Sequence, residues 1–295
     1  MDDHPARVIV GVDGSDGSIE ALRWAAHEAA RRGAPLHVVT CAQLPVSVEA
    51  GMVGAGAFAG SSMDAIVAEH QQTNQRAVGE ARSLSLAITV TGETVMGAPG
   101  YALVSGSHRN DVLVVGATSH PGRLTDLLGS VATAVVHRAT CPVVVVHGVG
   151  FAARPLQRIV VGVDGSPASD AALLWATEQA LHSGAEIVLV HGWIYPYHVS
   201  RTAANEPRDD MRVDAMRVLE SSAQRANELA PTVACHSIIT EENPAKAIVD
   251  TAAGADLVVV GSRGHGGFAA MLLGSVSRTV LQHAPCPVAV VRADA

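Results

Sequence analysis

The sequence predicts an α/β protein built from two tandem, doubly wound sheets of five parallel strands each. Short apolar runs alternate with segments of helical periodicity along the whole chain. Two turn motifs, each directly after an apolar run, occur once in each half. Because strands that alternate with helices are joined by right-handed crossovers, the strands of each half are expected to be parallel.

The duplication is seen in motifs that recur at matching distances. A Val-Asp-Gly-Ser turn contains Asp13 and recurs with Asp164, an offset of 151 positions (164 − 13). A glycine-rich turn begins at Gly116 and recurs at Gly261, an offset of 145 positions (261 − 116). We interpret the chain as a tandem duplication of one domain.

The first strand and helix of each half carry the clearest signals. Val8–Val12 is an all-apolar run of the kind that forms a central parallel strand. Ser18–Arg32 has its apolar residues at helical spacing, and Gly33 is expected to end that helix. In the second half, Ser166 is expected to cap the matching helix, with Pro167 at its first position.

The remaining elements follow in the same order in both halves. A long irregular stretch, expected to be a functional lid or a disordered segment, separates the second strand from a long helix. In the first half the predicted ranges are Leu36–Cys41 (strand), Gln43–Ser61 (irregular), Met63–Arg82 (helix), Leu86–Thr91 (strand), Tyr101–Ser107 (helix), a strand from residue 112, a helix, and Val143–Val146 (strand). In the second half they are Ile187–His191, Gly192–Glu206, Arg208–Leu229, Val233–Thr240, Pro244–Ala253, a strand from residue 257, a helix, and Val288–Val291.

The glycine-rich turn of the second half has the composition of a phosphate-binding loop. Gly261 and Gly264 lack β-carbons, so backbone N–H groups can approach an anion closely and adopt positive φ at little cost. Gly274 and Ser275 open a helix, whose N-terminus favours negative charge. Arg263 adds a full positive charge. A plain structural loop is the alternative, because a glycine-rich turn after a strand is a weak signal by itself.

The spacing of these residues resembles that of a known family. Gly, two residues, Gly, nine residues, Gly-Ser, together with Val-Asp-Gly-Ser after the first strand, resembles the universal stress protein family in its ATP-binding subclass. The resemblance covers essentially the whole chain, and the second half has the complete pattern. The first half has Gly116, Gly129 and Ser130, but Ser119 replaces the second glycine. If this position requires positive φ, Ser119 costs about 1 kcal/mol relative to Gly, which leaves the first site less well equipped.

The resemblance implies a fold and a ligand. The fold is like that of the adenine nucleotide alpha-hydrolases, with strand order 3-2-1-4-5. In such a sheet, ligands bind where the winding direction reverses, between the first and fourth strands. The implied ligand is ATP, with Mg²⁺ only as a companion of the triphosphate, because no carboxylate pair of the chain forms a cage for the ion.

The positions that match the family's nucleotide site lie in both halves. Asp13 and Asp164 are expected to contact the nucleoside, and an Asp that hydrogen-bonds its own turn is the alternative. The backbone of Cys41 and Gly192 is expected to face adenine. The complete predicted set is Gly11, Asp13, Cys41, Gly116, Ser119, Gly129, Ser130 and Val131 in the first half, and Gly162, Asp164, Gly192, Gly261, Arg263, Gly264, Gly274, Ser275, Val276 and Ser277 in the second.

The length of 295 residues suits two domains of ordinary size. The duplication predicts domains at 1–148 and 157–295, joined by a linker at 149–156. The apolar last strands would leave exposed sheet edges, which natural proteins usually cover. The family's habit implies that the two halves pair through these strands as a pseudo-dimer, and the sequence leaves a homodimer of whole chains open.

The charged residues exclude several functions. The net charge of −8, without a basic cluster, disfavours a nucleic-acid partner. Lys246 is the only lysine, and it does not follow a glycine-rich turn as the lysine of a P-loop does. The chain is therefore not expected to be a Walker-type NTPase. A receiver domain is disfavoured too, because the last strand of neither half offers a lysine.

Cysteine usage and hydropathy indicate a soluble, reduced setting. The 4 cysteines form no Cys-x-x-Cys pair, and no signal peptide is recognisable, so a cytoplasmic protein with free thiols is expected. No apolar run approaches the ~20 residues that span a bilayer, so no membrane partner is predicted. The 14 histidines show no metal-ligand spacing, and no metal-binding residue is predicted.

No catalytic residue is predicted, because no general base of clear identity lies beside the expected phosphates. The resemblance therefore implies a nucleotide-dependent regulator or sensor of the stress response. The alternatives are a slow ATPase or autophosphorylating protein, and a scaffold that dimerises without nucleotide. ATP pyrophosphatases and nucleotidyltransferases have other motifs after the first strand, so the Val-Asp-Gly-Ser turns argue against both.

Overall fold

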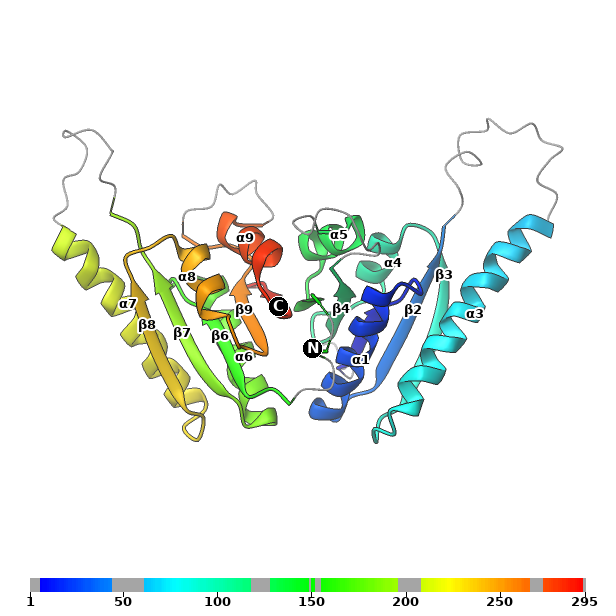
Figure 1. Ribbon diagram of the computed structural model, residues 1–295, viewed down its shortest axis with the longest axis horizontal. Coiled ribbons are helices and arrows are strands. Elements are labelled where there is room, and N and C mark those ends of the chain that lie inside the picture. Colours follow the sequence, from blue (N-terminus) through cyan, green and yellow to red (C-terminus); the bar gives the residue numbers. More distant parts are fainter. Residues whose placement is uncertain are drawn as a thin grey trace, which may run out of the picture. The chain divides into compact units, whose positions relative to one another are not determined.

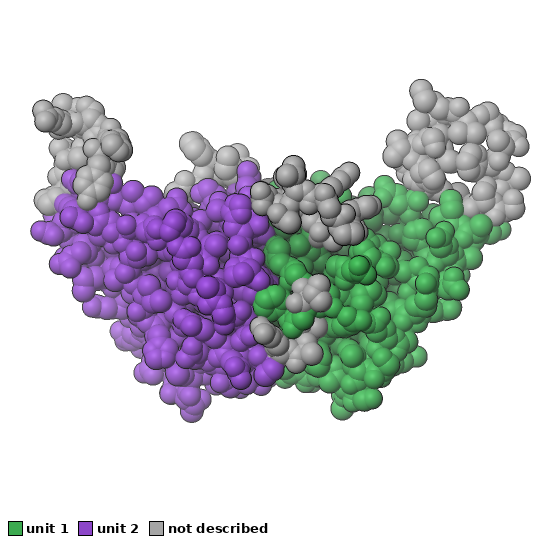
Figure 2. Space-filling view, viewed as in Figure 1, with its two compact units in different colours: residues 1–153 green, residues 154–295 purple. Residues whose placement is uncertain are grey.

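The computed structural model describes residues 6–43, 61–117, 128–148, 150–151, 155–195, 208–265 and 273–293, with side chains from residue 64 onward in the second range. The chain divides into two compact units, Met1–Ala153 and Arg154–Ala295 (Figure 2). Each unit is an α/β domain with its own parallel sheet, and Figure 1 labels the elements. The predicted fold class is therefore confirmed.

In the first unit, the described strands have the order β3-β2-β1-β4-β5, and all pairs are parallel. Val8 of the central strand pairs with Leu36 on one side and Val112 on the other, so the winding direction reverses there. The elements are β1 (Val8–Gly11), α1 (Asp16–Arg32), β2 (Leu36–Ala42), α3 (Ser61–Ser83), β3 (Val90–Met96), α4 (Pro99–Ser105), β4 (Val112–Gly116), α5 (Ser130–Arg138) and β5 (Val143–Val146).

The second unit repeats this topology. Its described strands have the order β8-β7-β6-β9-β10, again with parallel pairs. Ile159 of β6 pairs with Ile187 and with Leu257, so this sheet also changes winding direction at its first strand. The elements are β6 (Arg158–Gly162), α6 (Pro167–Ser183), β7 (Glu186–Gly192), α7 (Arg208–Leu229), β8 (Cys235–Thr240), α8 (Pro244–Thr251), β9 (Leu257–Gly261), α9 (Ser275–His283) and β10 (Val288–Val291).

Helices cover both faces of each sheet. In the first unit α1 and α3 pack together on one face, and α4 and α5 pack together on the other. The central strands are consequently buried on both sides, as the successive residues Val8, Ile9 and Val10 are, which point to alternate faces. This explains why the strands read as continuous apolar runs without alternation.

The predicted helix signals of α1 and α6 are confirmed. Ser166 Oγ accepts a hydrogen bond from the Ser169 N–H at 3.2 Å, and Pro167 is the first helical residue. Gly33 and Gly184 end the two helices with φ of 61° and 75°. Both lie in the left-handed region that glycine tolerates best, so these two stop signals have a backbone cause.

Some predicted boundaries were wrong. The third strand begins at Val90, where pairing with Leu36 begins, and not at Leu86. Residues just before it turn back on themselves, since Ser85 has φ of 55° and the Ile88 N–H donates to the Leu86 carbonyl at 2.8 Å. Its counterpart β8 likewise begins two residues later than expected. Helix α4 begins two residues earlier than expected, because Pro99 is its first residue. The predicted irregular stretches fall largely on 44–60 and 196–207, outside the described residues.

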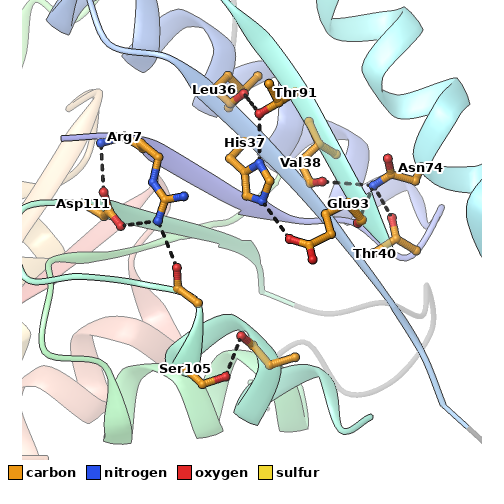
Figure 3. A network of polar contacts seen from close by, with 12 residues as sticks. Arg7, Leu36, His37, Val38, Thr40, Asn74, Thr91, Glu93, Ser105 and Asp111 are labelled. Atoms are coloured by element: carbon orange, nitrogen blue, oxygen red, sulfur yellow. Dashed lines mark hydrogen bonds and ion pairs between the residues drawn. The ribbon is translucent and has the colours of Figure 1, made fainter. Parts of the chain in front are cut away.

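One buried amide joins α3 to the sheet in the first unit. Asn74 Nδ2 donates to the carbonyls of Val38 and Glu93, each at 3.0 Å, and to Thr40 Oγ1 at 3.2 Å (Figure 3). Asn74 is 6% exposed, so these bonds are largely shielded from water. The second unit has Leu219 at the matching position, which shows that this polar contact is not required by the fold itself.

Candidate functional site

A cavity of about 490 Å³ lies at the carboxyl ends of β6 and β9, where the winding of the second sheet reverses. Each of the predicted site residues of the second half lines it: Gly162, Asp164, Gly192, Gly261, Arg263, Gly264, Gly274, Ser275, Val276 and Ser277. The structure thus brings together the turn after the first strand and the turn after the fourth strand of this unit.

The start of α9 forms one wall of the cavity. Gly274 occupies the N-cap position in an extended conformation, and it provides no side chain to bond the first backbone N–H groups of the helix. Such N–H groups have no partner within a helix, and the helix dipole makes this end favourable for an anion. Together with exposed Arg263 from the facing loop, this end can hold a negatively charged group.

The glycine-rich loop is fixed to α9 through one carbonyl group. The Ser262 carbonyl accepts from the Gly274 N–H at 2.8 Å and from Ser277 Oγ at 3.1 Å. The Ser262 N–H in turn donates to the Val291 carbonyl of β10 at 2.7 Å. Ser277 is 2% exposed, so its hydroxyl serves chiefly to hold the loop. Its counterpart in the first unit is Ala132, which lacks this bond.

Positive φ is not the reason for glycine at these positions of the loop. None of Gly261, Gly264 and Gly274 has positive φ, so the condition under which a serine at the second position would be strained is not met in this unit. A β-carbon on Gly261 would lie 2.7 Å from the carbonyl carbon of Ala168 in α6. Gly261 therefore permits close contact between helix and strand, and Gly116 does the same against Gly17 at 2.7 Å.

The Asp164 carboxylate joins the two turns of the second cavity. Its Oδ1 accepts from the Ser166 N–H at 3.0 Å, which is the self-capping alternative considered for this residue. Its Oδ2 accepts from the His265 N–H at 3.3 Å, across to the glycine-rich loop. A carboxylate has about four lone-pair sites, so these two bonds leave capacity for a ligand hydroxyl.

The cavity has an apolar side that the sequence analysis did not identify. Pro244 opens α8, and Ile248 one turn later lines the cavity beside Gly162. Their counterparts Pro99 and Leu103 line the first cavity. The signal was present in the sequence, because a proline followed four residues later by a large apolar residue recurs in both halves at the offset of 145 (244 − 99).

The first unit has a smaller cavity, of about 90 Å³, at the same place. The predicted residues Gly11, Asp13, Cys41, Gly116 and Val131 line it, whereas Gly129 and Ser130 are not among its described lining. Ser119 lies outside the described residues. Gly129 is the N-cap of α5 and Ser130 its first residue, the same places that Gly274 and Ser275 have in α9.

A cysteine side chain lines the first cavity where the second has a glycine. Cys41 occupies the position of Gly192, whose β-carbon would lie 2.7 Å from Pro244 Cα. Burial raises the pKa of the Cys41 thiol to about 11, and the charge of Glu93 adds to this. The thiol therefore stays protonated at neutral pH and behaves as a small apolar group.

The described residues hold no group of three His, Cys, Asp or Glu side chains that could bind a metal ion. In the same part of the chain, no helix combines the length and the apolar character needed to cross a membrane.

The fold and the cavity define a tandem, doubly wound α/β protein with an anion-favouring turn at the switch point of its second sheet. The model of the universal stress protein family matches residues 5–147 and 155–292. The chain belongs to the universal stress protein family, and the predicted tandem organisation of that family is confirmed.

Relatives agree with this assignment, and a solved structure shares the fold. The chain is 35% identical to the universal stress protein Rv2005c of Mycobacterium tuberculosis over 293 residues, which is 97% of this chain and 96% of that one. It is also 35% identical to a universal stress protein of Mycolicibacterium smegmatis over 292 residues, with the same shares covered. A crystal structure of a universal stress protein from Archaeoglobus fulgidus aligns with 97% of this chain and 96% of its own, at 21% identity and a TM-score of 0.69, and shows the shared fold. A universal stress protein solved in complex with cAMP aligns with 48% of this chain and 99% of its own, at 26% identity and a TM-score of 0.36.

Proposed function

We propose that the second unit binds an adenine nucleotide, with ATP as the expected ligand, and that the protein acts as a nucleotide-dependent regulator or sensor in the stress response. The observation that carries this proposal is the single cavity that joins Asp164, the loop with Arg263, and the start of α9. An acidic acceptor for sugar hydroxyls and an anion-favouring helix start then lie at one place.

Each part of the cavity has a role that its chemistry suits. The start of α9 and Arg263 would hold the phosphates through backbone N–H groups and a full positive charge. Asp164 would accept hydrogen bonds from the ribose. The apolar side with Ile248 and Pro244, next to the bare backbone of Gly192, would receive the base. Mg²⁺ would enter only with a triphosphate, because the described residues offer no group of three His, Cys, Asp or Glu side chains to hold the ion without it.

We propose that this binding is regulatory and that any hydrolysis is slow. Rate acceleration of phosphoryl transfer needs a placed nucleophile or water, and Arg263, Ser275 and His265 offer no evident base for one. ATP turnover by the full chain should stay well below the ~1 to 10³ per second of ordinary enzymes. Turnover in that range would make the protein an enzyme.

The test is titration calorimetry of the full chain with ATP. We expect one dominant site per chain, because the first cavity is smaller and lacks the second glycine. Arg263→Ala should weaken binding about tenfold or more, which is the loss of a charge-assisted contact worth ~1.5–3 kcal/mol.

Arg278→Ala is the matched control, since it removes the same charge from an exposed position of α9 without altering the cavity lining. Equal losses for both variants would mean that only net charge matters. No binding of ATP, ADP or cAMP to the unaltered chain would leave a nucleotide-independent scaffold.

A further inference from the structure

The loop that contains Arg263 is held to the turn after β6 by contacts that need no ligand. The His265 N–H donates to Asp164 Oδ2 at 3.3 Å, and Ser166 Oγ donates to the Arg263 carbonyl at 3.3 Å. The backbone of Asp164 is fixed, because its N–H donates to Ser169 Oγ of α6 at 3.1 Å. The carboxylate of this residue contacts the glycine-rich loop directly.

The Asp164 carboxylate occupies the space that a side chain at position 264 would need. A β-carbon at Gly264 would lie 2.1 Å from Asp164 Oδ2 and 3.3 Å from its Cγ. Real β-carbons essentially never approach another atom within 3.0 Å, so no side chain fits here while Asp164 keeps its position. Since Gly264 does not have positive φ, the carboxylate is the steric reason for the glycine.

Asp164 and Gly264 both line the cavity. A sugar hydroxyl that donates to Asp164 Oδ2 would displace the His265 N–H, although the carboxylate keeps other lone pairs, because this N–H bond is long, at 3.3 Å, and is the weaker one. Displacement would release the His265 N–H beside the place where phosphates are expected, because His265 also lines the cavity. Binding of the sugar hydroxyl and release of the His265 N–H would therefore be coupled through one carboxylate oxygen.

We propose that Asp164 is a positioning residue, which sets the conformation of the glycine-rich loop by occupying the side-chain space of Gly264. Binding of a ribose hydroxyl to Asp164 replaces the His265 N–H and thereby couples recognition of the nucleoside to the arrangement of the phosphate-binding loop. The ligand part of this inference rests on the proposed function, whereas the contact between Asp164 and Gly264 does not.

The first unit differs at the glycine of this contact. Asp13 Oδ1 accepts from the Ser15 N–H at 3.0 Å, as Asp164 Oδ1 does from the Ser166 N–H. The sequence has Ser119 where the second unit has Gly264, and therefore carries a β-carbon there.

The first experiment uses the full chain without nucleotide and measures hydrogen exchange at the His265 amide by NMR. Asp164→Asn keeps the size of the side chain and replaces one acceptor oxygen by a donor. Gly264→Ala pushes the carboxylate and the loop apart. Each change should speed exchange about fivefold or more, as expected for loss of one hydrogen bond.

The double variant D164G/G264A tests whether G264A acts through a clash with the Asp164 carboxylate or through a general disturbance of the loop. Removal of the carboxylate leaves room for the alanine, so the double variant should show clearly less than the combined effect of G264A and D164G. Asp170→Asn is the matched control, because Asp170 lies in the first turn of α6 and pairs with Arg225 away from the loop. Additive effects, or unchanged exchange in D164N and G264A, would overturn the role of Asp164.

The second experiment adds adenosine, which has the ribose but no phosphate. Adenosine should speed exchange of the His265 amide in the unaltered chain and leave it unchanged in D164N, and inorganic triphosphate should protect it in both. If bound adenosine slowed exchange of the His265 amide in the unaltered chain, or left it unchanged, the coupling would be overturned. Absence of any binding would contradict the proposed function, while the nucleotide-free experiment would still decide the role of Asp164.

Discussion

Replacing Gly261 by Ala tests why a glycine ends β9. The added β-carbon would lie 2.7 Å, 2.8 Å and 2.9 Å from Ala168 C, Ala168 O and Ser169 N. These three atoms belong to the backbone of α6, so no side-chain rotation can relieve the contact. The closest approach is about 0.7 Å shorter than the 3.4 Å at which ordinary contact begins, so α6 and β9 must separate.

Such overpacking costs ~1–3 kcal/mol of unfolding free energy. Each kcal/mol lowers the melting temperature of a domain of this size by about 2–6 °C. Urea unfolding followed by circular dichroism gives the stability, and peptide-resolved hydrogen exchange assigns the loss to the second unit. Gly116→Ala should destabilise the first unit similarly, because its β-carbon would meet Gly17 O at 2.7 Å.

Gly79→Ala is the control for this prediction. Gly79 lies inside α3 with nothing within 4 Å of an added β-carbon, so alanine should stabilise the chain by ~0.5–1 kcal/mol through helix propensity. A Gly261→Ala variant as stable as the unaltered chain would refute the assigned reason for this glycine.

Buried polar and thiol groups provide three further tests. Asn74→Ala should cost ~1–3 kcal/mol in urea unfolding, because the carbonyls of Val38 and Glu93 lose a buried donor, and an undiminished midpoint would contradict this. Alkylation of Cys41 by iodoacetamide at pH 8 should be about 100-fold slower than that of an ordinary cysteine, since its pKa is raised to about 11, and should accelerate as pH rises toward that value. Burial also raises the pKa of Cys141 to about 11 and of Cys286 to about 12, so the unfolded chain loses these protons first. The unfolding free energy should therefore fall as pH rises from about 9 to about 12, and Cys→Ala variants should flatten that fall.

The repeated motifs predicted the topology because they depend on local chemistry. A strand buried on both faces has to be apolar, and a helix stop at Gly33 has to tolerate positive φ. Strand beginnings were harder to predict. Nothing in the run from Leu86 to Thr91 shows that its first residues turn back before pairing, since that depends on where β2 begins.

The sequence predicted many of the residues that line the cavity of the second unit, but not the contacts that require them. Spacing selected Gly264 correctly as a cavity residue, yet its reason is the Asp164 carboxylate from a turn about 100 positions earlier. Likewise, Gly261 is explained by contact with α6, and Ile248 lines the cavity from a helix that carries no recognised motif. Such reasons arise between elements that are distant in sequence, so one sequence alone does not show them.

A crystal structure of the full chain grown with millimolar ATP would show whether the second unit holds an adenine nucleotide at the start of α9. We expect nucleotide in the cavity of the second unit, with phosphates against Gly274, Ser275 and Arg263 and a ribose hydroxyl on Asp164. An empty second cavity at that concentration, or nucleotide bound elsewhere on the chain, would contradict it.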